Sequence, residues 1–199
     1  MIFVVDDDPS VREALSDLFQ SVALPVKCFG SVDEFKGFRR PDAPACLLLD
    51  VRLPGTSGLD LQRELADAGE SVAIVFMTAY GDIPMAVRAI KRGAEEFLTK
   101  PFRDQELLEA VGRALAKARA RSERRAALNA IRERRERLTA REREVMARLV
   151  RGMRNKQIAA ELGRSEITVK THRRHIFEKM GAKTLADLVR MADVLRESE

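Results

Sequence analysis

Three consecutive aspartates end the first apolar run of the chain, in the sequence IFVVDDDPS at residues 2–10. Asp6, Asp7 and Asp8 repel one another, and taking any of them out of water costs free energy unless a partner compensates. Carboxylates that gather in this way need a cation, and hard oxygen ligands suit Mg²⁺, which favours sharing a phosphoryl group. The spacing therefore raises the question of which other side chains complete such a site.

Polar residues also follow three other apolar runs in the first half of the chain. Asp50 follows CLLL, Thr78 follows IVFM and Lys100 follows EFLT. Because ligands bind beyond the carboxyl ends of the strands in an open parallel sheet, we expect these residues to meet Asp6 and Asp7 at one edge. A hydroxyl and an ammonium beside a bound cation can neutralise a transferred phosphoryl group. Asp50 is the natural nucleophile, since carboxylates form acyl phosphates.

The elements that position these residues alternate between short apolar runs and longer amphipathic segments. Asp8 precedes Pro9 and is expected to cap a helix, and Ser31 with Glu34 forms a capping box at the start of another. Five β units, each followed by a helix, predict an α/β doubly wound five-stranded parallel sheet of the flavodoxin-like pattern. The predicted strands cover residues 2–5, 25–29, 45–49, 72–77 and 96–98.

The second half of the chain is predicted to be helical throughout. A helix from Asp104 to about Arg137 meets no breaker, and its apolar residues are too sparse for a heptad seam, so a charged helical linker or a partly flexible one is expected. Four short helices follow, and the tight GRS turn between two of them indicates a helix-turn-helix. The helices are expected at residues 140–150, 155–162, 165–180 and 184–196.

Charge divides the chain into two unlike halves. Residues 1–116 contain 13 Lys and Arg against 19 Asp and Glu, whereas residues 117–199 contain 23 against 12. The basic half predicts a polyanionic partner such as nucleic acid. We expect a domain at 1–116, a linker at 117–137 and an all-α domain at 138–199. Cys28 and Cys46 are expected to be reduced thiols, and with no secretory signal or membrane-spanning run the sequence predicts a cytoplasmic protein.

Four motifs in order carry a family resemblance. The stretches VVDDDPSVREAL, LLLDVRLPGTSGLDL and FMTAYGDIPMAVRAIKRGAEEFLTKPF resemble the receiver domain of two-component response regulators, a CheY-like fold. The stretch LTAREREVMARLVRGMRNKQIAAELGRSEITVKTHRRHIFEKMGAKTLADLVRMA is similar to the LuxR-type helix-turn-helix domain of the FixJ/NarL branch, and FixJ-like regulators are the most similar. The resemblance covers nearly the whole chain and implies a phosphorylation-dependent transcriptional regulator.

The resemblance assigns roles around the proposed acidic pocket. Asp50 becomes the phosphoacceptor, Asp7 binds Mg²⁺ directly, Asp6 binds it through water, and the backbone carbonyl of Arg52 is a further ligand. Asp50 itself completes the metal site.

The same resemblance assigns the remaining residues of the pocket. Thr78 contacts the phosphoryl group, Lys100 pairs with it, and Thr78 and Phe97 form the switch that reports phosphorylation. The Lys100–Pro101 peptide bond is expected to be cis. Arg52 and Tyr80, each two residues beyond a pocket residue, are expected to shield the phosphoryl group and so slow self-dephosphorylation.

The third helix of the basic domain is expected to read DNA. Its apolar stripe of Val169, Ile176 and Met180 should face the core. Lys170, Thr171 and Arg174 fall on the opposite side, where the resemblance places contacts to base edges. Ile167 lies near the same outer face, where a lone exposed apolar residue without function is expected and contact with a thymine methyl is the alternative.

Other polar residues of this domain have two readings. Asn155, Lys156 and Arg173 are either phosphate contacts or ordinary surface residues, with equal weight. His172 is expected to be a hydrogen-bonded structural residue, with a base contact or a metal ligand as the alternatives.

The resemblance also implies partners. A histidine kinase donates the phosphoryl group, a homodimer forms on phosphorylation through a face that includes Val87 and Lys91, and promoter DNA is bound, with RNA polymerase a candidate further partner. The protein is then not an enzyme, beyond its own phosphorylation and slow dephosphorylation. One alternative is an Mg²⁺-dependent phosphatase, although Arg52 stands where such enzymes place a second Asp. The other is a phosphorylation-independent DNA-binding protein that uses its receiver only to dimerise.

Overall fold

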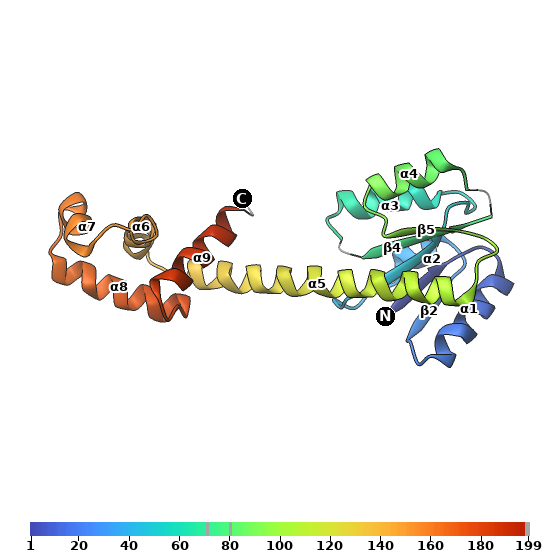
Figure 1. The fold of residues 1–199 in the computed structure, drawn as a ribbon, viewed down its shortest axis with the longest axis horizontal. Coiled ribbons are helices and arrows are strands. Elements are labelled where there is room, and N and C mark those ends of the chain that lie inside the picture. The colour runs from blue at the N-terminus through green and yellow to red at the C-terminus, as the bar shows by residue number, and fades with distance from the viewer. Residues whose placement is uncertain (71, 80, 198–199) are drawn as a thin grey trace. The chain divides into compact units, whose positions relative to one another are not determined.

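The computed structural model describes residues 1–70, 72–79 and 81–197 and is drawn in Figure 1. Contacts divide the chain into two compact units, Met1–Glu123 and Arg124–Glu199. The division falls inside one long helix, α5, which runs over Asp104–Glu136. The domain limits expected from the sequence remain a prediction beside this division.

The first unit is built on a five-stranded parallel sheet with the strand order β2-β1-β3-β4-β5. Strand β1 lies between β2 and β3, and its first residue, Ile2, pairs with both Val26 and Cys46. This sheet confirms the doubly wound class expected from the apolar runs, and each strand lies within two residues of its predicted bounds. The strands are β1 Ile2–Val5, β2 Val26–Phe29, β3 Cys46–Asp50, β4 Ala73–Thr78 and β5 Glu96–Thr99.

Helices cover both faces of the sheet (Figure 1). Phe35 of α2, Leu61 of α3 and Ala89 of α4 pack on one face, and Phe19 of α1 and Leu107 of α5 pack on the other. Burial on both faces explains why the inner strands β1, β3 and β4 are apolar up to their carboxyl ends. The helices of this unit, besides α5, are α1 Pro9–Ser21, α2 Val32–Gly37, α3 Gly58–Asp67 and α4 Ile83–Lys91.

Local capping fixes where these helices begin. The Asp8 carboxylate accepts a hydrogen bond from the Ser10 N–H at 2.8 Å, so the third aspartate is the N-cap of α1, as predicted. Ser31 caps α2 as expected, but the Glu34 carboxylate accepts from the Gly30 N–H instead of that of Ser31. The capping box is therefore displaced by one residue, because Glu34 reaches the loop that precedes the cap.

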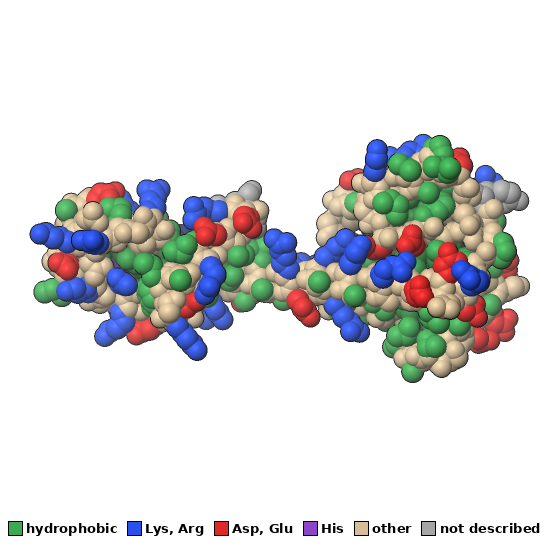
Figure 2. All heavy atoms as spheres, in the orientation of Figure 1, with side chains coloured by type: hydrophobic (Ala, Val, Ile, Leu, Met, Phe, Trp, Pro, Cys, Tyr) green, Lys and Arg blue, Asp and Glu red, His purple; other side chains and the backbone are tan. Residues whose placement is uncertain are grey.

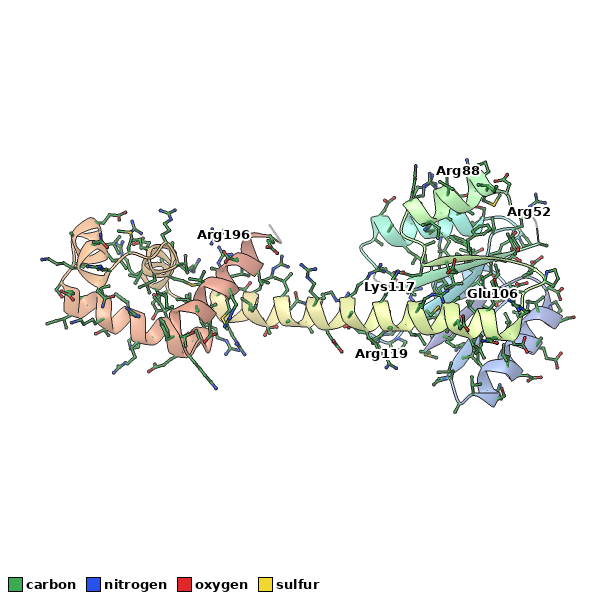
Figure 3. All side chains as sticks on the ribbon, viewed as in Figure 1. Arg52, Arg88, Glu106, Lys117, Arg119 and Arg196 are labelled. Atoms are coloured by element: carbon green, nitrogen blue, oxygen red, sulfur yellow. The ribbon has the colours of Figure 1, made fainter. Side chains whose placement is uncertain are left out.

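Helix α5 is anchored to the first unit by apolar and charged contacts. Its buried residues end at Ala118. The buried carboxylate of Glu95 pairs with Lys117 Nζ at 2.5 Å and with Arg121 Nη2 at 2.7 Å, and Lys117 is labelled in Figure 3. Towards the other end of α5, Ile131 packs partly against the core of the second unit. The predicted helix from Asp104 is therefore present as one uninterrupted element.

The second unit is all-α, as predicted. Gly163 and Gly181 adopt left-handed conformations, with φ values of 61° and 67°, and end α7 and α8. The short turn from Gly163 to Ser165 joins α7 to α8 as a helix-turn-helix. The helices are α6 Ala140–Leu149, α7 Asn155–Leu162, α8 Glu166–Met180 and α9 Leu185–Arg196. In the part of the chain that is described, no helix has the length and apolar character needed to cross a membrane.

Candidate functional site

Three carboxylates converge at the carboxyl ends of β1 and β3. Asp6, Asp7 and Asp50 each place an oxygen within 4.8 Å of the others. Asp6 is completely buried, Asp50 is 7% exposed, and Asp7 lies at the surface. The sheet thus brings together residues that are far apart in the sequence, and the exposed Asp7 leaves the cluster accessible from solvent.

Lys100, which follows β5, inserts its ammonium between two of these carboxylates. Its Nζ lies 2.6 Å from Asp6 Oδ2 and 2.6 Å from Asp50 Oδ2. Burial disfavours the charge of this lysine, but the hydrogen bonds to Asp50 and Asp6 outweigh that effect and raise the pKa of Lys100. The backbone supports the placement, because the Lys100 N–H donates to the Thr78 carbonyl at 2.8 Å.

One ammonium does not fully compensate the charge of the pocket. Burial raises the pKa of Asp6 even though Lys100 and the Asp8 N–H both donate to its carboxylate. A carboxylate in this condition gains from a further cation. The donor set, three carboxylates of which one is exposed, fits Mg²⁺, which takes oxygen ligands and keeps part of its water.

Asp50 is held by the loop that follows it. Its Oδ1 accepts a hydrogen bond from the Arg52 N–H at 2.9 Å, and Arg52 is labelled in Figure 3. The loop returns beneath the strand end, so that a Cβ placed on Gly58 would lie 2.2 Å from the Asp50 carbonyl oxygen. Only glycine fits at this approach, and the sequence analysis did not identify Gly58 as part of the site.

The expected switch residues lie beside the same pocket. Thr78 is completely buried at the end of β4, and the half-buried ring of Phe97 lies 6.1 Å from the ring of Phe76. A Cβ on Gly81 would come within 2.7 Å of the Phe97 ring and 3.1 Å of Thr78 Cγ2, so the loop after β4 contacts both residues. The Lys100–Pro101 peptide bond is cis, as expected. Tyr80 lies outside the described residues.

Helix α8 of the second unit presents two faces, as the periodicity predicts. Val169, Ile176 and Met180 are buried in the core, whereas the three predicted base-contact residues are exposed. Ile167 is 76% exposed on the outer side. Figure 2 shows Lys and Arg side chains spread over the visible face of this unit. The exposed residues expected to contact bases are Lys170, Thr171 and Arg174.

The other predicted contacts of this unit differ in their surroundings. Lys156 is exposed, whereas Arg173 Nη1 donates to Asn155 Oδ1 at 3.4 Å and its guanidinium lies 5.5 Å from the Phe177 ring. Arg173 and Asn155 therefore link α7 to α8 within the domain.

His172 departs from its expected hydrogen-bonded state. Within the described part of the chain, its buried Nδ1 has no hydrogen-bond partner. The residue lines a hollow with the apolar Val145, Leu162 and Val169, and with polar side chains that do not reach its Nδ1: Arg141, Glu144, Arg164 and Thr168.

A charged cluster between α6 and α8 escaped the sequence analysis. Glu142 is only 3% exposed and accepts from Lys179 Nζ at 2.6 Å and from the Thr139 N–H at 2.8 Å, and His175 Nδ1 lies 3.6 Å away. Burial opposes its charge, but the bonds from Lys179 and Thr139 prevail and lower the pKa of Glu142. The TARE capping box was the available signal, whereas the partners on α8 could be found only from the fold.

Comparisons with known proteins identify the family of each unit. Residues 2–112 match the family described as "Response regulator receiver domain", and residues 136–192 match "Bacterial regulatory proteins, luxR family". The chain belongs to the response regulators that join a receiver domain to a LuxR-type DNA-binding domain. Such a protein is a phosphorylation-dependent transcription regulator, not a classical enzyme.

Individual relatives cover nearly the whole length of the chain. Nodulation protein W of Bradyrhizobium diazoefficiens is 51% identical over 98% of this chain and 86% of its own length. The transcriptional regulatory protein FixJ of Azorhizobium caulinodans is 41% identical over 96% of this chain and 90% of its own. Among solved structures, the response regulator StyR superposes with a TM-score of 0.88 at 45% identity, covering 96% of this chain and 97% of that one. The expected family and fold class are therefore confirmed.

Proposed function

We propose that Asp50 accepts a phosphoryl group from a partner histidine kinase, and that the phosphorylated chain binds promoter DNA as a homodimer. The observation that carries this assignment is the shared position of Lys100, 2.6 Å from both Asp50 and Asp6, beside the exposed carboxylate of Asp7. An acceptor carboxylate, a cation and an accessible cluster of oxygen ligands are the parts that phosphoryl transfer requires.

In this proposal the metal ligands are Asp6, Asp7, Asp50 and the backbone carbonyl of Arg52. When bound, Mg²⁺ supplies positive charge that neutralises the oxygens of the transferred group. The carboxylates that hold the ion repel one another, which disfavours their ionised forms. The ion and Lys100 together compensate the negative charge of the pocket.

The transfer step uses residues of the chain in defined roles. An Asp50 carboxylate oxygen forms a bond to phosphorus while the bond from phosphorus to the histidine nitrogen of the donor breaks, and its electron pair leaves with the imidazole. Lys100 pairs with the phosphoryl oxygens, and the Thr78 hydroxyl contacts one of them. Thr78 and Phe97 then shift, and the loop that contains Gly81 moves with them because both residues contact it.

Dimerisation is proposed to use the outer face of α4. Ile83, Val87 and Ile90 are large apolar residues with exposures of 81%, 45% and 44%. Lys91 at the end of the same helix adds charge to this face. Apolar residues exposed together on one short helix are typical of an interface.

On DNA, Lys170, Thr171 and Arg174 are proposed to contact bases, because they are exposed together on the outer face of α8. Lys156 is proposed to contact a phosphate. Asn155 and Arg173 are proposed to do so as a linked pair. We also propose a cytoplasmic location, where promoter DNA and RNA polymerase, a candidate neighbour, are found.

The test of the acceptor is labelling of the full chain with ³²P-acetyl phosphate in the presence of Mg²⁺. We expect acid-labile, acyl-phosphate labelling of the wild type and of the control Asp67→Asn, which changes an exposed aspartate of α3, and none of Asp50→Asn. Label retained by Asp50→Asn would refute the assignment. Sustained turnover of p-nitrophenyl phosphate would instead favour a phosphatase.

A further inference from the structure

Arg12 reaches back from α1 to the loop that carries the acidic pair. Its Nη1 donates to the Asp6 carbonyl at 2.8 Å and to the Asp7 carbonyl at 3.0 Å. These two carbonyls lie on either side of Asp7, so a single nitrogen fixes the peptide planes that flank it. Because those planes set the direction of the Asp7 side chain, the bonds define where its carboxylate can lie.

The guanidinium is itself held in place. It packs on the loop after β2, where a Cβ on Gly30 would lie 3.6 Å from Arg12 Cζ. The Arg12 N–H also donates to the Asp8 carbonyl at 3.1 Å as part of the first turn of α1. Arg12 therefore connects the start of α1, the loop after β2 and the acidic loop.

The choice of acceptors shows what this residue does. The hydrogen bonds that Arg12 makes to the loop go to neutral backbone carbonyls, while the Asp6 carboxylate is occupied by the Asp8 N–H at 3.0 Å and by Lys100. A permanent positive charge this close to a divalent-cation site weakens cation binding by repulsion. A geometric benefit must exceed that penalty if the arginine is to help the site.

We infer that Arg12 is a positioning residue, which holds the Asp6–Asp7 backbone in the orientation that binds the divalent cation. The inference rests on the proposed function of the same pocket. Groups that orient metal ligands from the next layer typically change metal affinity by about 10–100-fold. If Arg12 acted through its charge alone, the effect on Mg²⁺ affinity would have the opposite sign, because removing the positive charge of Arg12 would tighten Mg²⁺ binding.

The test is isothermal titration of Mg²⁺ into the full chain for the wild type, Arg12→Gln, Arg12→Lys and Arg113→Gln. The control residue, Arg113, pairs with Glu96, the first residue of β5. This pair lies at the amino ends of the strands, whereas the acidic pocket lies at their carboxyl ends. We expect Arg12→Gln to bind Mg²⁺ about 10-fold more weakly, Arg12→Lys to fall between it and the wild type, and Arg113→Gln to match the wild type. Equal or tighter binding by Arg12→Gln overturns the inference.

Labelling with ³²P-acetyl phosphate separates positioning from general damage. Arg12→Gln should be labelled slowly at limiting Mg²⁺ and at the wild-type rate when Mg²⁺ is saturating. A loss that persists at saturating Mg²⁺ overturns the positioning role, and if Arg12→Gln does not fold, Arg12→Lys answers the same question. If the wild type binds no Mg²⁺, the proposed function fails and the inference with it, whereas normal binding by both variants removes the inference alone.

Discussion

Asp6 in the receiver domain and Glu142 in the DNA-binding domain are both buried carboxylates, but their pKa values move in opposite directions. Burial raises the pKa of Asp6 despite its two hydrogen bonds, whereas the bonds from Lys179 and Thr139 overcome burial and lower that of Glu142. Asp6 shares the ammonium of Lys100 with Asp50. Glu142 shares its cationic partners with no second buried carboxylate in the described chain.

The difference separates a site from a structural cluster. The negative charge around Asp6 exceeds the positive charge beside it, so the pocket favours binding of a cation. Uncompensated buried charge of this kind is typical of functional sites. The charge of Glu142 is compensated by its partners, so we assign this cluster to stability and not to binding. Substituting one carboxylate at a time should therefore give unlike results in the two domains.

The largest effect is expected from Glu142→Gln. It leaves Lys179 without its carboxylate and weakens the bond to the Thr139 N–H, so we expect the DNA-binding domain to lose about 3 kcal/mol of stability. Urea unfolding followed by helical circular dichroism measures the change. The control, Glu144→Gln, alters a residue of α6 whose side chain is 40% exposed and pairs with Arg141, and it should be nearly neutral. Equal losses of stability from the two substitutions would contradict the structural role assigned to Glu142.

A second test concerns charges of the DNA-binding domain that have no structural role. Lys170→Ala and Arg174→Ala should each weaken binding to a specific site by about 1–3 kcal/mol and relax the sequence preference. Their partners in the free protein, Glu166 and Glu178, lie on the same helix at 3.5 and 3.7 Å, so folding should be unaffected. Sites selected from genomic fragments provide the probe.

Lys156→Ala is the matched control for those two variants. It should weaken binding to all sequences alike and reduce the salt dependence. If all three variants lose affinity uniformly, with the sequence preference unchanged, the assignment of base contacts is wrong.

A smaller effect is expected from Asp6→Asn in the receiver domain. The substitution removes a buried charge that the fold compensates poorly, and Lys100 keeps its contact with Asp50. We expect the stability of the metal-free protein to change by about 1 kcal/mol or less, while Mg²⁺ affinity falls. Urea unfolding with and without Mg²⁺ gives both quantities. A loss in the metal-free state as large as that of Glu142→Gln would contradict the comparison.

The smallest effect is the pH dependence. Because the pKa of Glu142 is lower in the folded state than its usual 4.5, its contribution is present above that pH and disappears as the pH falls through the folded value. The pKa of Asp6 is raised above 3.8, so protonation of Asp6 as the pH falls through its folded pKa favours the folded receiver. Acid unfolding should therefore show Glu142→Gln with a shallower stability loss below about pH 4.5 than the wild type. Parallel curves would contradict the assigned direction.

Much of the pocket could be predicted because parallel sheets collect the ends of their strands at one edge. Asp50, Thr78 and Lys100 each follow an apolar run, and that position alone was enough to group them with Asp6. No comparable rule links Glu142 to Lys179, since their contact depends on how α6 crosses α8. Arg12 also escaped prediction, because its backbone acceptors leave no trace in residue types.

Strand β1 is synthesised before the other four strands of its sheet, yet it occupies an inner position with β2 and β3 on its two sides. On the ribosome it must wait for residues up to Asp50 before both of its ladders can form. The face of the sheet that α1 and α5 share then stays only partly covered until α5 emerges as far as Ala118, the last of its buried residues. A nascent chain that stalls before this point leaves the face that contains Val4, Leu48 and Val75 with α1 alone as cover, and the uncovered part is a surface open to chaperones or to aggregation.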